Sequence, residues 1–158
     1  MKRSSARLSN KCSNIHVYGI GNPSRQDDAL GILFTDSMKQ WAESHKLSNI
    51  SFDSNYQLNV EDALNISEMD IVIFVDASVE PIEDFNFRTL RAKKSTPFST
   101  HSMKPESVVA LCEELFGKKP KVYLLTIKGY SWTLSAPITE KARANLAKAL
   151  EFLKKKIK

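Results

Sequence analysis

DIVIFVD, residues 70–76, is the strongest indication of a β-strand in this chain. Between its two aspartates, every residue is β-branched or aromatic. Such an unbroken apolar run is typical of a central parallel strand covered on both faces, whereas a half-exposed strand alternates apolar and polar residues. The segment therefore predicts the centre of a parallel sheet, with Asp76 at the carboxyl end of its strand.

Strand-like and helix-like segments alternate on both sides of this run. Further strands are predicted at residues 15–20, 49–53, 85–90 and 121–127. Apolar residues at helical spacing predict helices at residues 28–44, 61–66, 105–116 and 137–155. This alternation predicts an α/β fold, with a three-layer, mostly parallel twisted sheet of about five strands and helices on both faces. We expect a phosphorylase/hydrolase-like arrangement.

The length and charge distribution limit the classes of protein to consider. A chain of 158 residues fits one domain, and we expect a flexible basic tail at residues 1–14 and a single α/β domain at residues 15–158. The net charge of +5 comes from the two ends of the chain, while the middle is acidic. A nucleic-acid-binding protein carries its positive charge on the folded face that meets phosphate, so we expect no nucleic-acid partner.

The cysteine content and hydropathy indicate a cytoplasmic protein. Two cysteines, Cys12 and Cys112, do not make a disulfide framework, and Cys112 falls in an apolar helical pattern. The first apolar segment is too short for a signal peptide, and no run approaches the length of a membrane span. We expect no membrane partner, and a monomer is the simplest expectation.

GIGNPSRQDDALG, residues 19–31, connects the first strand to the first helix. The segment lacks the third glycine of a dinucleotide-binding GxGxxG motif, because Ser24 stands there, and it lacks the Lys of a Walker A loop. It carries two carboxylates where a pyrophosphate would need free backbone N–H groups. A helix N-cap would account for Asp27 but leaves Asp28 unexplained.

Three residues from distant loops are predicted to meet at one edge of the sheet. Right-handed crossovers bring every strand-to-helix loop to the same edge, where ligands bind in such folds. Asp28, Asp76 and His101 each lie in or beside such a loop. Two carboxylates and an imidazole suit a borderline divalent ion such as nickel or zinc, and three protein ligands leave positions open for water or substrate.

Nucleophilic catalysis has little support in the sequence. There is no GxSxG motif, and Ser99 and Ser102 only flank His101 in sequence. The remaining histidines, His16 in a strand and His45 after a helix end, have no evident partner and are interpreted as exposed residues without a functional role.

The motifs GIGNPSRQDDALG, IVIFVDA and STHSM occur in the order and spacing that resemble the hydrogenase maturation proteases, also called hydrogenase-processing endopeptidases. A weaker match is Tyr56-Gln57-Leu58, and the resemblance extends over residues 15–152. It implies an aspartic-type endopeptidase that removes the C-terminal extension from the immature large subunit of a nickel–iron hydrogenase. Ala29 departs from the glycine of many members, which leaves the identity of the precursor open.

The resemblance assigns roles to individual residues. It makes Asp28, Asp76 and His101 the metal-contacting and catalytic residues. The nickel is carried by the substrate, and free nickel or cadmium can occupy the same site in vitro. Substrate contacts are expected from four further residues, Asn22, Arg25, Asp27 and Gln57. Whether nickel polarises the scissile peptide, or serves only for recognition while Asp27 or Asp28 acts as general base, stays open.

Three other functions remain compatible with the sequence. One is a small Rossmann-like, nucleotide-dependent enzyme. Another is a non-catalytic nickel-binding chaperone that holds the precursor without cutting it. The third is a protease of the same fold that acts on a different precursor.

Overall fold

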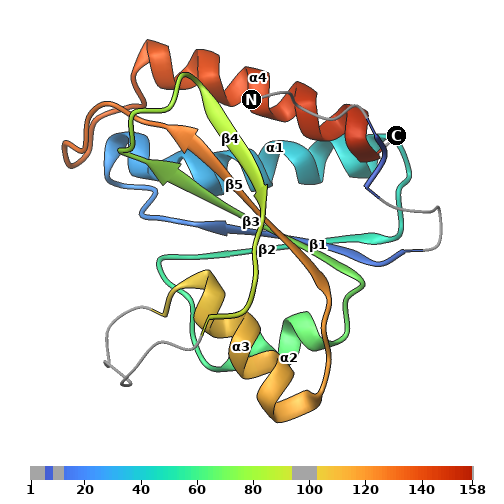
Figure 1. Ribbon diagram of the computed structural model, residues 1–158. Coiled ribbons are helices and arrows are strands. Elements are labelled where there is room, and N and C mark those ends of the chain that lie inside the picture. Colours follow the sequence, from blue (N-terminus) through green and yellow to red (C-terminus); the bar gives the residue numbers. More distant parts are fainter. Residues whose placement is uncertain (1–5, 9–12, 94–102, 158) are drawn as a thin grey trace.

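The computed structural model describes residues 6–8, 13–93 and 103–157, which form a five-stranded sheet between two pairs of helices (Figure 1). The strands are β1 (Ile15–Ile20), β2 (Ile50–Asn55), β3 (Ile71–Ser78), β4 (Phe85–Thr89) and β5 (Lys121–Lys128). The helices are the 3₁₀ turn η1 (Gln26–Ala29), α1 (Leu30–Ser44), α2 (Glu61–Ser67), α3 (Pro105–Phe116) and α4 (Glu140–Ile157). The strand order is β2-β1-β3-β5-β4, and only the pairing of β4 with β5 is antiparallel.

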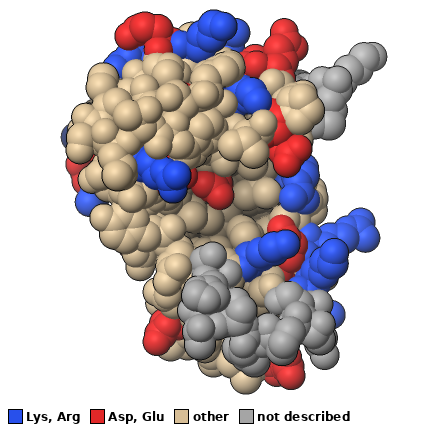
Figure 2. All heavy atoms as spheres, turned by 90° about the vertical axis from the view of Figure 1, so that its left-hand side faces the viewer, with Lys and Arg blue, Asp and Glu red and all other residues tan. Residues whose placement is uncertain are grey.

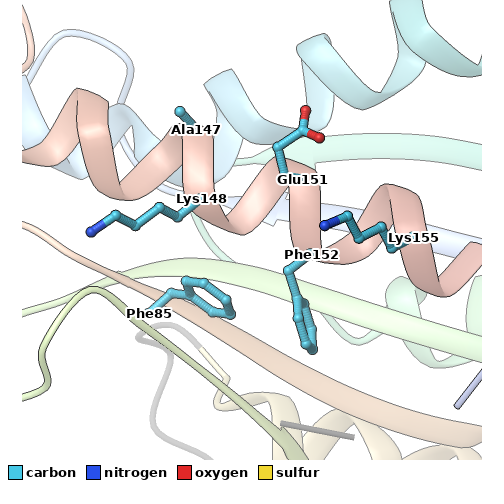
Figure 3. Close-up of a pocket in the computed structure, with 6 residues that line it drawn as sticks. All are labelled: Phe85, Ala147, Lys148, Glu151, Phe152 and Lys155. Atoms are coloured by element: carbon cyan, nitrogen blue, oxygen red, sulfur yellow. The ribbon is translucent and has the colours of Figure 1, made fainter. Parts of the chain in front are cut away.

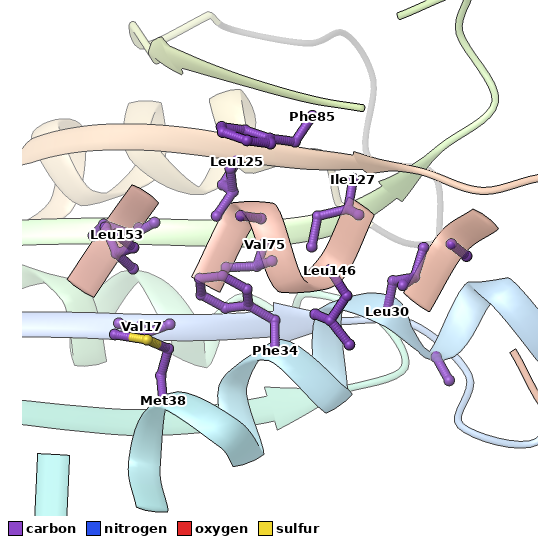
Figure 4. Close-up of a cluster of buried hydrophobic side chains, with 14 of the residues drawn as sticks. Val17, Leu30, Phe34, Met38, Val75, Phe85, Leu125, Ile127, Leu146 and Leu153 are labelled. Carbon is purple, nitrogen blue, oxygen red and sulfur yellow. The ribbon is translucent and has the colours of Figure 1, made fainter. Parts of the chain in front are cut away.

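Each face of the sheet is covered by two helices and has its own apolar core. Helices α1 and α4 lie on one face, and α2 and α3 lie on the other (Figure 1). In β3, Ile73 and Val75 face the first core, whereas Val72 and Phe74 face the second. Figure 4 shows side chains of α1 and α4 meeting those of the strands in the first core. The three-layer α/β fold predicted from the alternation of strands and helices is confirmed, with residues 71–78 as the central strand β3.

Several elements begin or end where their sequence signals predict. Helix α3 begins at Pro105, and Gly117 ends it in the left-handed conformation with φ 62°. The boundaries differ elsewhere: β2 extends to Asn55, and a 3₁₀ turn precedes α1. Helix α4 begins at Glu140, where the Thr139 hydroxyl accepts a hydrogen bond of 3.3 Å from the Ala142 N–H.

The described part of the N-terminal segment packs against the end of α4. The Leu8 N–H donates to the Lys156 carbonyl at 3.1 Å, and Lys156 Nζ donates to the Ala6 carbonyl at 3.1 Å. The same ammonium lies 5.2 Å from the centre of the Phe152 ring. Residues 6–8, which the sequence placed in a basic tail, thus contact the folded domain. Over the described residues, no helix combines the length and apolar character needed to cross a membrane.

Candidate active site

A pocket at the carboxyl edge of the sheet contains both Asp28 and Asp76. Its volume is about 330 Å³, and its walls come from the loop after β1, the end of β3, residues 56–58 and residues 103–105. Seen towards the edge where β3 and β5 end, the surface is hollowed near its middle (Figure 2). The crossovers of the sheet therefore bring together two of the three residues that the sequence predicts for the site.

The loop after β1 holds the carboxylate of Asp28 in the pocket. Asp28 Oδ2 accepts a hydrogen bond of 3.0 Å from the Asn22 N–H, and the Asp28 N–H donates to the Arg25 carbonyl at 3.0 Å. Gly21 has φ 145°, and a Cβ atom there would collide with the Asp28 carbonyl oxygen. Glycine is required at this position because the chain passes so close to Asp28.

Asp76 is half-buried, and its carboxyl group is unusually reluctant to ionise. Its pKa is raised from 3.8 to about 7, chiefly by burial and in smaller part by the nearby charge of Asp28, while a hydrogen bond from the Ala77 N–H acts in the opposite direction. That hydrogen bond to Asp76 Oδ1 is 2.8 Å long. A carboxyl group with a pKa near neutrality can accept or donate a proton at physiological pH, as general acid–base catalysis requires.

His101, the third predicted member of the site, lies outside the described residues. The described chain resumes at Met103, which lines the pocket and pairs with Leu58 in an isolated antiparallel bridge. Within the described ranges, no three histidine, cysteine, aspartate or glutamate side chains form a group that could hold a metal ion. The two carboxylates of Asp28 and Asp76 are thus the described part of the predicted ligand set.

Asp27 does not have the position expected of a substrate contact, a helix cap or a general base. Its side chain is fully buried, with 0% exposure. Its carboxylate accepts hydrogen bonds from the N–H groups of Tyr130, Ser131 and Thr139 and from the Thr139 hydroxyl. The expected substrate-contact role of Asp27 is corrected, because its oxygens face the segment after β5. The sequence could not reveal this, since the partners lie about 100 residues away.

Of the other predicted substrate contacts, only Gln57, which is exposed, lines the pocket. Asn22 borders it through the N–H that binds Asp28, while its side-chain oxygen accepts a hydrogen bond of 2.9 Å from the Ser24 N–H. Arg25 is exposed, and its Nε donates to the Trp132 carbonyl at 3.3 Å.

Some pocket residues had no role in the sequence prediction. Met103, Lys104 and Pro105 line the pocket together with the loop after β1. The sequence predicted residues 105–116 only as a helix. The only sequence feature that could have pointed to these residues as part of the site is that they lie close to His101 in the chain.

The loop after β1 is not arranged to bind a nucleotide. Binding of a pyrophosphate at a glycine-rich turn requires free backbone N–H groups directed at the ligand. Here the Asn22 N–H is bound to the Asp28 carboxylate, and the Gly21 N–H donates to the Asn55 carbonyl at 3.1 Å. The Rossmann-like alternative therefore has no phosphate site in this loop.

A second pocket, of about 460 Å³, lies between β4 and α4. Phe85 and Phe152 provide its apolar wall, and Lys148 and Lys155 flank it (Figure 3). It has a single acidic side chain, Glu151, and lacks the paired carboxylates found at the strand ends. Of these two pockets, only the one at the carboxyl edge of the sheet has paired carboxylates, those of Asp28 and Asp76.

His16 and His45 lie outside the candidate site. His16 is buried on β1, where its Nδ1 is 2.7 Å from Ser51 Oγ and its Nε2 lacks a described hydrogen-bond partner. Burial lowers the pKa of His16, and the charges of Asp53 and Asp62 partly offset that effect. His45 is exposed at the end of α1. The expected exposure is confirmed for His45 and is wrong for His16, which is buried beside Ser51.

Comparisons with known proteins identify structural relatives. No protein-family model and no curated protein sequence matches the chain. The [NiFe] hydrogenase maturation protease HycI from Thermococcus kodakarensis KOD1 is 25% identical, with 90% of this chain and 93% of that chain covered and a TM-score of 0.68. The hydrogenase maturating endopeptidase HybD from E. coli is 20% identical, with 87% and 88% covered and a TM-score of 0.65.

A third structure has the same fold. The hydrogenase 2 maturation peptidase from Thaumarchaeota archaeon SCGC_AB-539-E09 is 17% identical, with 89% and 95% covered and a TM-score of 0.64. These comparisons confirm the predicted resemblance in fold, and the match to the maturation protease HycI supports an endopeptidase. In its fold, the chain is a structural relative of the hydrogenase maturation proteases.

Proposed function

We propose that this protein is a cytoplasmic, monomeric endopeptidase that removes the C-terminal extension from the immature large subunit of a nickel–iron hydrogenase. The observation that carries the proposal is the shared pocket of Asp28 and Asp76 at the carboxyl edge of the sheet. Asp28 comes from the turn after β1 and Asp76 from the end of β3, and the charge of Asp28 contributes to the raised pKa of Asp76. Such a pair of carboxylates is costly unless it binds a ligand or takes part in a reaction.

Nickel enters this proposal as part of the substrate. The precursor would present its nickel to Asp28 and Asp76, with His101 as the third ligand. Oxygen and imidazole ligands suit nickel, and positively charged nickel would relieve the repulsion between the two carboxylates. The specificity for a nickel-loaded precursor would follow, because a precursor without metal leaves the two acids repelling each other.

Two chemical mechanisms fit the pocket. In the first, the nickel polarises the scissile carbonyl or lowers the pKa of a bound water molecule. In the second, nickel serves only for recognition, and Asp76 takes a proton from the attacking water, a task that suits a pKa of about 7. Asp27 is not a candidate base, because its oxygens are saturated by the segment after β5.

The decisive experiment incubates a nickel-loaded, C-terminally extended hydrogenase large subunit with wild-type protein and with Asp28→Ala. Asp36→Ala is the matched control, because Asp36 is exposed on α1 and does not line the pocket. We expect trimming by wild type and the control and none by Asp28→Ala. Equal trimming by Asp28→Ala would refute the proposed site. Retention of the precursor without cutting by wild type would favour the non-catalytic chaperone.

The contribution of His101 needs a separate measurement. Calorimetry with free cadmium or nickel compares wild type, His101→Ala and the exposed-histidine control His45→Ala. We expect loss of binding only in His101→Ala. An affinity equal to that of wild type would remove His101 from the site.

A further inference from the structure

The turn that presents Asp28 is attached to a segment that is distant in sequence. Residues 24–27 contact residues 131–135 through several hydrogen bonds outside the Asp27 carboxylate. The Asp27 N–H donates to the Ser131 carbonyl at 3.1 Å, and the Ser24 carbonyl accepts from the Ser135 N–H at 2.8 Å. Gln26 Oε1 accepts from the Thr133 N–H at 3.1 Å, although Gln26 has φ 46°, a conformation that non-glycine residues rarely adopt.

The strongest part of this attachment is the carboxylate of Asp27. Its oxygens accept four hydrogen bonds, of 2.7 Å from Tyr130, 3.2 Å from Ser131, and 2.8 Å from both the N–H and the hydroxyl of Thr139. A Cβ atom on Gly129 would lie 2.9 Å from Asp27 Cβ, so the two segments also pack closely. A fully buried carboxylate with four donors fixes its surroundings, because each lost bond would leave a buried polar group without a partner.

Asp27 and Asp28 are consecutive, but their side chains form hydrogen bonds with different segments of the chain. The carboxylate of Asp27 binds the segment after β5, whereas that of Asp28 binds the Asn22 N–H and lines the pocket. The Asp28 N–H is held by the Arg25 carbonyl within the same turn. Any shift of residues 25–27 would therefore move Asp28 relative to Asp76, which is fixed separately on β3.

We propose that Asp27 is a positioning residue, whose attachment to Thr139 and its neighbours holds Asp28 at the correct place in the pocket. This inference rests on the proposed function, in which Asp28 meets the substrate. It accounts for both acids of the pair: one contacts the substrate's metal, and the other fixes the turn that carries it. The segment at residues 130–139 is thus part of the site without lining the pocket.

The test uses Thr139→Val, which preserves side-chain shape but removes the hydroxyl donor to Asp27 together with the acceptor for the Ala142 N–H at the start of α4. It disturbs the Asp27 site less than a change of Asp27 itself. Thr139→Ser retains the hydroxyl and should restore the wild-type behaviour. Thr133→Val is the matched control, because the Thr133 side chain is exposed in the same segment. Asp27→Asn is the stronger variant, since its amide group would direct N–H donors at other N–H donors.

The first readout is amide hydrogen exchange at Asn22, measured by NMR, which reports on the bond to Asp28 without requiring activity. We expect exchange at Asn22 to rise by about tenfold or more in Thr139→Val, the effect of losing one hydrogen bond to a charged group. Cadmium, used as the probe of the pocket, should bind correspondingly more weakly. Wild-type exchange and cadmium affinity in Thr139→Val, or equal changes in Thr133→Val, would overturn the inference.

The second readout is the trimming of nickel-loaded precursor. Misplacement of Asp28 should lower kcat by about tenfold with KM nearly unchanged, because substrate still binds but meets a displaced group. Wild-type kcat in a folded Thr139→Val would overturn the positioning role while leaving the proposed function intact. Absence of trimming by wild type, with the expected exchange and cadmium results, would refute the proposed function and support the positioning role.

Discussion

Replacement of Asp76 by asparagine should stabilise the protein while abolishing its proposed activity. The folded state holds a proton on Asp76 up to about pH 7, whereas the unfolded chain releases it near 3.8. Between these values the folded state binds more protons, so stability falls as the pH rises through this window. Each pKa unit corresponds to about 1.4 kcal/mol, which sets an upper limit of roughly 4 kcal/mol on the destabilisation above pH 7.

The asparagine side chain would retain the oxygen that accepts the hydrogen bond from Ala77 and would remove the charge that Asp28 repels. Urea unfolding followed by circular dichroism at pH 4 and pH 8 measures the difference in the free energy of unfolding between Asp76→Asn and wild type. We expect a clear gain at pH 8 that nearly vanishes at pH 4, and no pH-dependent gain in the exposed control Asp36→Asn. A loss of stability at pH 8, or the same gain at both pH values, would refute the reasoning.

Three further predictions concern the pocket and the core. Cadmium affinity, measured by calorimetry, should fall by up to about tenfold per pH unit below pH 7, as the proton on Asp76 competes with the metal. Gly21→Ala should cost about 1–3 kcal/mol in urea unfolding and weaken cadmium binding, whereas Gly117→Ala, whose added Cβ meets open space, should leave binding unchanged. Burial lowers the pKa of His16, so the neutral side chain contributes stability that is lost as the pH falls below 6.5. His16→Asn removes this titration and should make the melting temperature fall less between pH 6.5 and pH 5.

The fold was predictable because its central signals are local. The apolar run at residues 70–76 and the strand at residues 15–20 need no knowledge of distant residues to be recognised. Helix α3 is bounded by Pro105 and Gly117, which act through their own backbone preferences. The 3₁₀ turn before α1 was not predicted, because its shape depends on contacts with the segment after β5.

The candidate site was predictable only in part. The meeting of Asp28 and Asp76 follows from topology, because loops after parallel strands share one edge. The burial of Asp27 could not be predicted from the sequence. The N–H groups that surround Asp27 come from a loop that has no charged residue to suggest a partner. The raised pKa of Asp76 likewise depends on three-dimensional burial, which a strand-end position does not reveal.

The contact between residues 6–8 and the final turn of α4 has a consequence for engineering. Leu8 and Lys156 are joined by a backbone hydrogen bond, so a short linker between the two ends would span little distance. Such a circular permutant could be opened at the turn after Gly117, on the far side of the sheet from α1 and α4. The order of the chain would change while the pocket at the strand ends kept every one of its walls.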